Sequence, residues 1–224
     1  TAGAGSGGSV TPSGVLTLNH GSAQSFSFQP VTGYRISDVR VDNVSVGTPS
    51  EYTFNNINAN HTVSVQFAII VNTVTATAQQ GGSITPSGNV RVNYGNSQTF
   101  TISAGEGYYI SDVKADNVSQ GAITSFTFNN VISNHSIAAE FTPVTYIVSA
   151  SAGNGGTISP SGNISVTHGS NRTFTFTPGF GYMVGDVRVD NISVGALTSY
   201  TFNGVTGDHT ISVTFATATY TLEA

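Results

Sequence analysis

The sequence predicts an all-β protein of three tandem β-sandwich-like modules of 74 residues, arranged as an elongated rod. Single residues recur at an unbroken spacing of 74 along the 224-residue chain, as Pro12, Pro86 and Pro160 do. Apolar and polar residues alternate with period two, which is typical of half-buried strands. No apolar pattern recurs at helical spacing over a window as long as a helix, so repeated strands are the expected structure.

The repeat sets the expected module boundaries. We predict modules at residues 1–71, 72–145 and 146–219, with the first strand of module 1 incomplete and residues 220–224 starting a further strand. Few residues separate the last strand of one module from the first strand of the next, and these junctions are not rich in Gly and Ser. Because flexible linkers are rich in Gly and Ser, we expect these junctions to be stiff.

Each module is expected to hold six to eight short strands. The alternation is clearest at residues 25–28, at the end of each module (residues 63–67 in the first), and at Leu16 and Leu18. β-Branched and aromatic residues fill the apolar positions, which favours strands further. The counterparts of Leu16 and Leu18 in the other modules are Val90, Val92, Ile164 and Val166.

Short polar motifs mark the turns between these strands. Residues 11–14 read Thr-Pro-Ser-Gly, in which Pro presets φ and Gly closes a turn. Asp42-Asn43 lies between alternating arms and predicts a two-residue hairpin, because Asp and Asn tolerate the left-handed region. Gly7-Gly8 marks a tight bend, and a change of apolar parity near Ser37-Asp38 predicts a β-bulge.

Composition excludes several classes of protein. The chain has no Cys, so a disulfide framework, a zinc finger or a thiol enzyme is impossible. Six basic residues against eleven acidic ones argue against a nucleic-acid partner, which needs clustered cations. The longest apolar run, Phe67–Val71, is far shorter than the ~18 residues of a membrane span, so we expect no membrane insertion.

Two motifs were weighed for chemistry and interpreted as structural. Residues 3–8 match GxGxxG by letter, but a dinucleotide site needs a strand before the motif and a helix after it. His61, His135 and His209 recur at a strand start, where one active site repeated in three modules is improbable. We therefore expect a glycine-rich turn and hydrogen-bonding histidines, with no catalytic, cofactor-binding or metal site and no cofactor.

The charged and aromatic residues also repeat. Asp38, Arg40 and Asp42 are spaced by two, which predicts a solvated charged ladder on one strand face in preference to a calcium site. Tyr52 and Tyr200 are expected in the core, although exposed tyrosines would offer a carbohydrate platform. Seven Asn-x-Ser/Thr sequons are interpreted as turns first and as glycan sites second: Asn43, Asn60, Asn117, Asn134, Asn163, Asn171 and Asn191.

Several motifs occur in order at fixed spacing in residues 146–215: GGxIxPSG, GYxxxDVxVDN, SxTF and HTISVTF. In this the chain resembles the divergent internalin-type B-repeats of bacterial secreted and surface proteins, in three tandem copies. The resemblance implies an extracellular or cell-surface stalk, spacer or adhesive segment and transfers no catalytic residue. It also implies a β-grasp-like fold with a short helix, for which these residues leave little room.

These observations predict a non-enzymatic structural repeat array that acts as a stalk, a spacer or a subunit of an extracellular filament. The alternative is an adhesive module that binds carbohydrate or a partner on a host surface.

The two ends of the sequence leave two explanations open. Module 1 lacks counterparts of Tyr146, Ile147 and Val148, and the tail aligns with Tyr146–Ala150. Either the sequence is cut from a longer array, or the tail of one chain adds as a strand to module 1 of another chain. The candidate strand-donation segment is Tyr220, Thr221, Leu222, Glu223 and Ala224.

Overall fold

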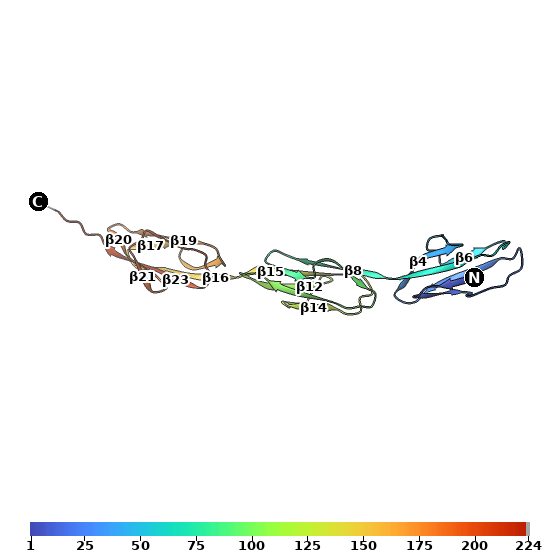
Figure 1. Ribbon diagram of the computed structural model, residues 1–224. Helices are drawn as coiled ribbons and strands as arrows, with labels where there is room; N and C mark the ends of the chain where they lie inside the picture. Colours follow the sequence, from blue (N-terminus) through green and yellow to red (C-terminus); the bar gives the residue numbers. More distant parts are fainter. Residues whose placement is uncertain (223–224) are drawn as a thin grey trace. The chain divides into compact units, whose positions relative to one another are not determined.

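The computed structural model describes residues 1–222, which form β-strands joined by turns and short loops (Figure 1). No helix occurs among these residues, so the all-β prediction is confirmed and the short helix of a β-grasp is not seen in the described part. The chain forms two compact units, and their division runs through the second copy of the repeat. The first unit comprises Thr1–Ala78, Ile84–Ile102 and Val113–Ala139; the second comprises Gln79–Ser83, Ser103–Asp112 and the chain from Glu140 onward.

The first copy is a two-sheet sandwich. One sheet has the order β1-β7-β4-β5 and the other the order β2-β3-β6. Val10, Phe26 and Phe28 from one sheet pack with Val39 and Val63 from the other in a single buried cluster. The strands are β1 (Ala2–Ala4), β2 (Gly8–Thr11), β3 (Gln24–Pro30), β4 (Tyr34–Val41), β5 (Val44–Ser45), β6 (Glu51–Phe54) and β7 (Val63–Ile69).

The second copy repeats these elements and adds one strand. Its first strand, β8, pairs antiparallel with β10 and parallel with β15. β11 pairs with β14, and β12 forms a hairpin with β13. The strands are β8 (Val71–Ala78), β9 (Gly82–Thr85), β10 (Gly88–Asn93), β11 (Gln98–Ala104), β12 (Tyr108–Ala115), β13 (Val118–Ser119), β14 (Ser125–Phe128) and β15 (His135–Pro143).

The third copy has sheets of order β18-β16-β23-β20-β21 and β17-β19-β22, which enclose one core around Phe174 and Val187. β16 and β23, its first and last strands, pair in parallel, whereas the neighbouring pairs are antiparallel. The strands are β16 (Thr145–Ala152), β17 (Gly156–Ser159), β18 (Gly162–Thr167), β19 (Arg172–Pro178), β20 (Tyr182–Val189), β21 (Ile192–Gly195), β22 (Ser199–Phe202) and β23 (His209–Thr217).

The predicted turns occur where the sequence placed them. Asp42 and Asn43 have φ of 50° and 67° between β4 and β5, so the two-residue hairpin is confirmed. The pairing of β4 with β7 shifts register between Ile36 and Asp38, which confirms the bulge. The peptide bonds Thr11–Pro12, Thr85–Pro86 and Ser159–Pro160 are cis, which the sequence analysis did not anticipate.

Two expectations about the first copy are wrong. Leu16 and Leu18 were expected in a strand, but only a bridge between Ala2 and Gly14 forms there. Their counterparts in β10 and β18 pair with the first halves of β8 and β16. The strand β1 corresponds only to the second half of β8, so Leu16 and Leu18 have no strand beside them to pair with. Asp42 was expected on the same strand face as Asp38 and Arg40, but it lies in the hairpin turn.

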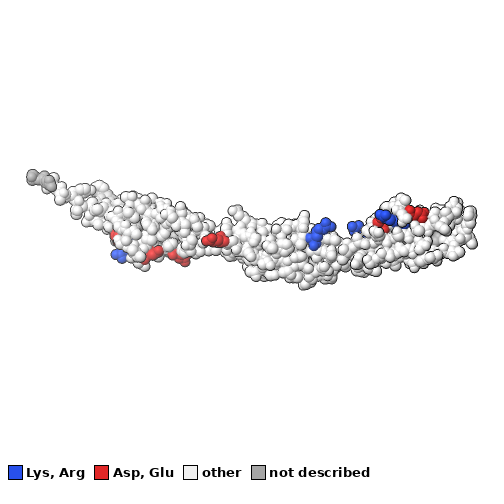
Figure 2. All heavy atoms as spheres, viewed as in Figure 1, with Lys and Arg blue, Asp and Glu red and all other residues white. Residues whose placement is uncertain are grey.

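Charged side chains are sparse on the face that Figure 2 shows, most of which carries neither sign. Arg40 Nε lies 2.7 Å from Asp38 Oδ2, and Arg188 Nε lies 3.2 Å from Asp186 Oδ2. The hydrogen bond from the Ser45 hydroxyl, and to a smaller extent that from Arg40, holds the pKa of Asp38 below its usual value. Ser193 and Arg188 lower the pKa of Asp186 in the same way. Such exposed pairs contribute little to stability, so packing must hold the sandwich together.

Candidate functional site

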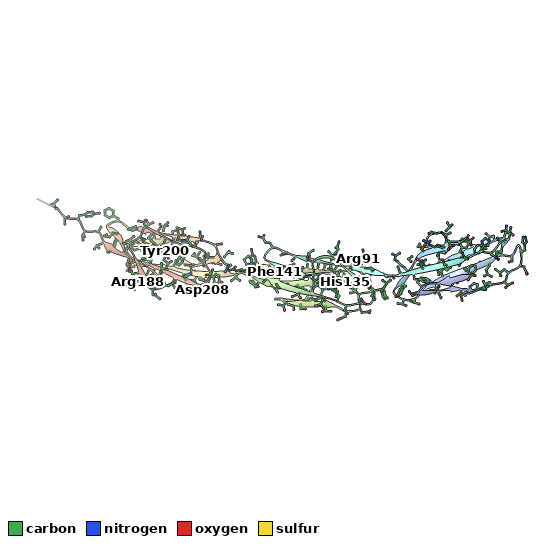
Figure 3. All side chains as sticks on the ribbon, viewed as in Figure 1. Arg91, His135, Phe141, Arg188, Tyr200 and Asp208 are labelled. Carbon is green, nitrogen blue, oxygen red and sulfur yellow. The ribbon has the colours of Figure 1, made fainter. Side chains whose placement is uncertain are left out.

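An Asp–His pair recurs in all three copies. His61 Nδ1 lies 2.7 Å from Asp42 Oδ2. The same distance separates His135 from Asp116 and His209 from Asp190, and Figure 3 labels His135. The backbone N–H of the residue after each His donates to the other carboxylate oxygen over 2.8 Å. The pair therefore ties the hairpin turn to the first residues of the last strand in the second and third copies, and to the residues just before that strand in the first.

A Phe ring supports each of these histidines. The centroids of Phe54 and His61 are 4.7 Å apart, and the other two copies have 4.8 Å between the corresponding rings. This triplicated contact fixes the imidazole plane as well as its Nδ1 hydrogen bond. The hydrogen-bonding role predicted for the histidines is confirmed. Within residues 1–222, no group of three His, Cys, Asp or Glu side chains is placed to hold a metal ion.

The hydrogen bonds of the pair favour the ionised carboxylate. The Thr62 backbone N–H and then His61 hold the pKa of Asp42 below its usual value. Burial raises the pKa of Asp116 and of Asp190, but the bonds from the histidines and the backbone N–H groups outweigh it, and both values end below the usual one. The ionised carboxylate accepts, so His Nδ1 carries the proton that it donates.

We predict that the pairs stabilise the fold at neutral pH and lose this effect in acid. A carboxyl whose pKa is lower in the folded state stabilises above its unfolded pKa, and the effect fades as pH falls through the folded pKa. The triple variant Asp42→Asn, Asp116→Asn, Asp190→Asn should therefore unfold at less urea than the parent at about pH 7, and the gap should close as the pH falls through the usual Asp pKa of about 3.9 and below it. Circular dichroism measures both curves, and a gap that stays constant over this range would rule out the carboxylate charge as the cause.

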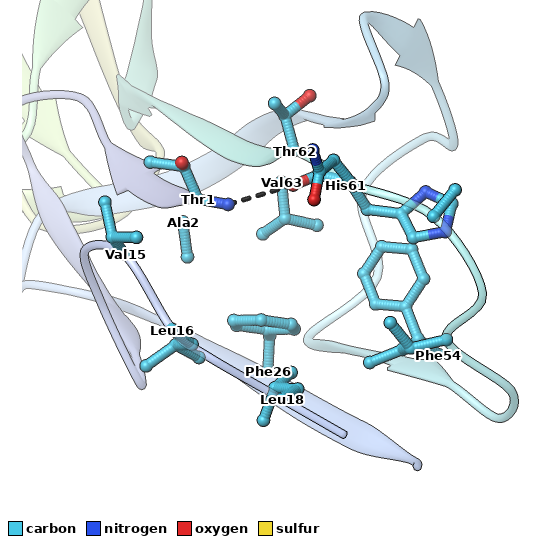
Figure 4. A pocket seen from close by; sticks show the side chains of 13 residues that line it. Thr1, Ala2, Val15, Leu16, Leu18, Phe26, Phe54, His61, Thr62 and Val63 are labelled. Atoms are coloured by element: carbon cyan, nitrogen blue, oxygen red, sulfur yellow. Dashed lines mark hydrogen bonds between the residues drawn. The ribbon is translucent and has the colours of Figure 1, made fainter. Parts of the chain in front are cut away.

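A groove of about 440 Å³ opens at one side of the first copy (Figure 4). It runs between the segment of Leu16 and Leu18 and residues 61–63, which lead into β7, with Phe26 and Phe54 among the residues that line it. The Thr1 amino group donates to the His61 carbonyl over 2.9 Å at the edge of the groove. Apolar side chains and the beginning of a strand thus face the same open space.

The same position is occupied by a strand in the other two copies. Val74 pairs with Val90 on one side and with His135 on the other, and Val148 pairs in the same way with Ile164 and His209. Both valines are 0% exposed. The corresponding borders in the first copy are Leu16 and His61, which flank the groove. The groove of the first copy therefore lies at the position that a strand segment occupies in the other two copies.

The side chain before each histidine also belongs to this arrangement. Asn134 Oδ1 accepts from the Thr73 backbone N–H over 2.8 Å, and Asp208 Oδ1 accepts from Ile147 N–H over the same distance. Asn60 is their counterpart and lines the groove. This role was not predicted, although the repeated NHT, NHS and DHT triplets carried its signal.

The described part of the candidate strand-donation segment, residues 220–222, lies outside any strand. Tyr220 is 92% exposed and Leu222 is 99% exposed, and Thr221 is exposed as well. Glu223 and Ala224 lie outside the described residues. The donation of this segment to another chain stays a prediction.

Among the tyrosines weighed as a carbohydrate platform, Tyr52, Tyr108 and Tyr200 are partly buried, whereas Tyr109 is 52% exposed. Tyr52 and Tyr200 pack against the cores of their copies, each with its ring centroid 5.0 Å from that of a neighbouring Phe. The Tyr108 ring covers Gly81. The core role predicted for Tyr52 and Tyr200 is confirmed, and these three residues present no flat exposed platform.

The fold and its threefold repetition define a tandem array of small all-β modules. Residues 72–145 match the family described as the divergent InlB B-repeat domain. The match covers the middle copy from end to end, and the flanking copies carry the same motifs at the same positions, as the resemblance predicted. The matched family is a structural repeat family, typical of bacterial surface proteins.

Two solved structures show weaker likeness. The Bacillus anthracis TIE protein is 10% identical with a TM-score of 0.32, and the match covers 92% of this chain and 57% of that chain. The I9–I11 tandem of titin is 9% identical with a TM-score of 0.15, over 87% of this chain and 93% of that one. This chain therefore spans less than two thirds of the TIE structure, and both scores are too low to support an argument.

No curated protein matches the sequence significantly. Among residues 1–222, no helix has the length and apolar character needed to cross a membrane.

Proposed function

We propose that this chain is a non-enzymatic structural repeat of a secreted or cell-surface bacterial protein, and that copies of it join head to tail into an extracellular filament. In this role it acts as a stalk or spacer whose length grows by strand complementation. The supporting observation is the open groove of the first copy, at the position where the other two copies hold a strand.

The register of the later copies specifies how a donated tail would pair. Val74 stands opposite Val90, and Val148 stands opposite Ile164. By the spacing of 74, Leu222 of one chain takes the position of these valines and stands opposite Leu16 of the next chain. Tyr220 then stands opposite Leu18, as Tyr146 stands opposite Val166. Both apolar side chains of the tail face apolar side chains of the groove.

Burial of Leu222 supplies much of the expected affinity. Its side chain is 99% exposed in the single chain, whereas Val74 and Val148, at the equivalent position of the later copies, are 0% exposed. Full burial of a Leu side chain contributes about 1.5–3 kcal/mol. Backbone hydrogen bonds to an open strand edge add to this, and they are the usual source of affinity in strand addition.

Asn60 provides a polar anchor for the same strand. In the later copies its counterparts accept from the backbone N–H one residue before the buried Val. In the donated tail that residue is Thr221, so the Thr221 N–H donates to Asn60 Oδ1. A backbone donor that enters the groove thereby keeps a partner, which burial requires.

The tail and the groove can be tested separately. A labelled peptide with the sequence of residues 217–224 should bind the chain that lacks residues 220–224, and fluorescence anisotropy measures its affinity. The matched peptide with Leu222→Asp should bind at least about tenfold more weakly, because a charge replaces the buried leucine. Equal affinity of the two peptides, or no binding of either, would contradict the proposal.

The full chain gives the complementary test. We predict that the parent forms larger assemblies as its concentration rises, and that deletion of residues 220–224 leaves a monomer. Sedimentation velocity measures the size distribution and electron microscopy its form. A parent chain that stays monomeric at high concentration, or a deletion that assembles unchanged, would refute head-to-tail donation.

A further inference from the structure

The junctions between copies share one backbone arrangement. Ile70, between β7 and β8, donates its N–H to the Gly33 carbonyl over 2.8 Å, and its own carbonyl accepts from the Tyr94 N–H over 2.8 Å. At the next junction Val144 donates to the Gly107 carbonyl over 2.8 Å and accepts from the His168 N–H over 2.9 Å. A single residue therefore bridges a glycine of one copy and an aromatic residue of the next.

The aromatic ring of each junction lies on the glycine. A Cβ added to Gly33 would meet the Tyr94 ring at 2.8 Å, and one added to Gly107 would meet the His168 ring at 2.4 Å. Both glycines have positive φ, 86° and 74°. Glycine is needed at this position for two reasons. A positive φ is unfavourable for any residue with a side chain, and a Cβ atom would displace the ring.

The third copy presents half of such a junction. Ala218 donates to the Gly181 carbonyl over 2.9 Å, as Ile70 and Val144 do to their glycines. Gly181 has φ of 79°, but nothing lies within 4 Å of an added Cβ. Phe180 beside it is 106% exposed. Its counterpart Glu106 places Oε1 3.9 Å from Nε2 of the junction residue His168, so this position faces the incoming ring.

The matching half is found in the first copy. His20 is exposed and stands 74 residues before Tyr94, in the turn that follows Leu18. The junction ring is therefore His, Tyr and His in the three copies. If Leu222 is placed opposite Leu16, Ala218 reaches His20 in the same register in which Ile70 reaches Tyr94.

We propose that His20 of one chain docks on Phe180 and Gly181 of a second chain and forms a third junction of the same kind. This inference rests on the proposed strand donation and adds a second contact to it. The His20 N–H donates to the Ala218 carbonyl, and the imidazole covers Gly181 and packs against the Phe180 ring. The partner of both exposed ends is then the same chain. The donated tail supplies affinity, and the ring on glycine sets the orientation of one copy on the next.

Variants of the full chain test this junction. Gly181→Ala should weaken assembly about tenfold, because the methyl group occupies the space that the His20 ring needs. The matched control is Gly195→Ala in the same copy, since Gly195 has a similar φ of 85° and equally open surroundings. His20→Ala should weaken assembly about tenfold as well, whereas His20→Tyr should restore it because Tyr94 serves in the equivalent junction.

The outcomes separate this inference from the proposed function. Sedimentation equilibrium gives the association constant of each variant, and the peptide of residues 217–224 measures groove binding alone. The His20→Ala chain should keep its peptide affinity, because the peptide carries no Gly181. If Gly181→Ala and Gly195→Ala assemble equally well while tail deletion abolishes assembly, the junction is refuted and strand donation stands. If tail deletion changes nothing, both proposals fail.

Discussion

Replacement of Phe174 by Ala should lower the free energy of unfolding of the third copy by about 3–5 kcal/mol, the range for a buried aromatic residue. Phe174 is 0% exposed in β19 and meets Phe202 edge to face at a centroid distance of 6.0 Å. Its removal leaves a cavity that both sheets border. Cavities of this kind remain partly unfilled, because packed neighbours relax only in part.

The first copy provides a matched control for this prediction. Phe26 occupies the equivalent position in β3, but it lines the groove. In the free chain Phe26→Ala enlarges a space that is already open, so its cost should be smaller than that of Phe174→Ala. Because several modules need not unfold as one, hydrogen exchange of the amides in β3 and in β19 is the suitable measurement. Equal losses in the two copies would contradict the open groove.

Replacement of Gly155 by Ala should cost about 2–4 kcal/mol through two additive effects, backbone strain and overpacking. Gly155 has φ of 99°, and an added Cβ would meet the Tyr182 ring at 2.4 Å. Gly7 and Gly81 face Tyr34 and Tyr108 in the same way, at 2.3 Å in both cases. The double-glycine motif thus serves ring packing as well as a tight bend.

Gly195→Ala again supplies the control, because Gly195 has φ of 85° with nothing within 4 Å of an added Cβ. It should cost only the strain of a left-handed alanine, about 1–2 kcal/mol. Hydrogen exchange of the amides in the third copy measures both losses. If Gly155→Ala lowered the free energy of unfolding no more than Gly195→Ala does, the contact with the Tyr182 ring would not contribute to stability.

Local sequence patterns predicted the local structure well. Alternation in β3 and β19 located strands, Asp42-Asn43 located a hairpin, and the change of parity near Ser37 located a bulge. Each of these features depends on neighbours a few residues apart, which a sequence displays directly. The 74-residue period then transferred each assignment to the other copies.

Long-range partners could not be predicted in this way. The parallel pairing of the first and last strands of a copy joins residues about 60 positions apart, and alternation alone does not say which strands are neighbours. Asp42 and His61 were both noted, but 19 residues separate them and only the fold brings them together. Leu16 and Leu18 had a correct strand pattern, yet a strand also needs a paired edge.

Disulfide trapping tests the central proposal, strand donation between chains, most directly, because the parent chain has no Cys. A mixture of Leu16→Cys and Leu222→Cys chains should form a mixed cross-linked dimer under mild oxidation, since directly opposed residues of antiparallel strands have Cβ atoms about 4.5–5.5 Å apart. Mass spectrometry should identify the joined peptides, and Thr17→Cys, one register position away, should cross-link far less. Equal trapping at positions 16 and 17, or none at either, would contradict the proposed assembly.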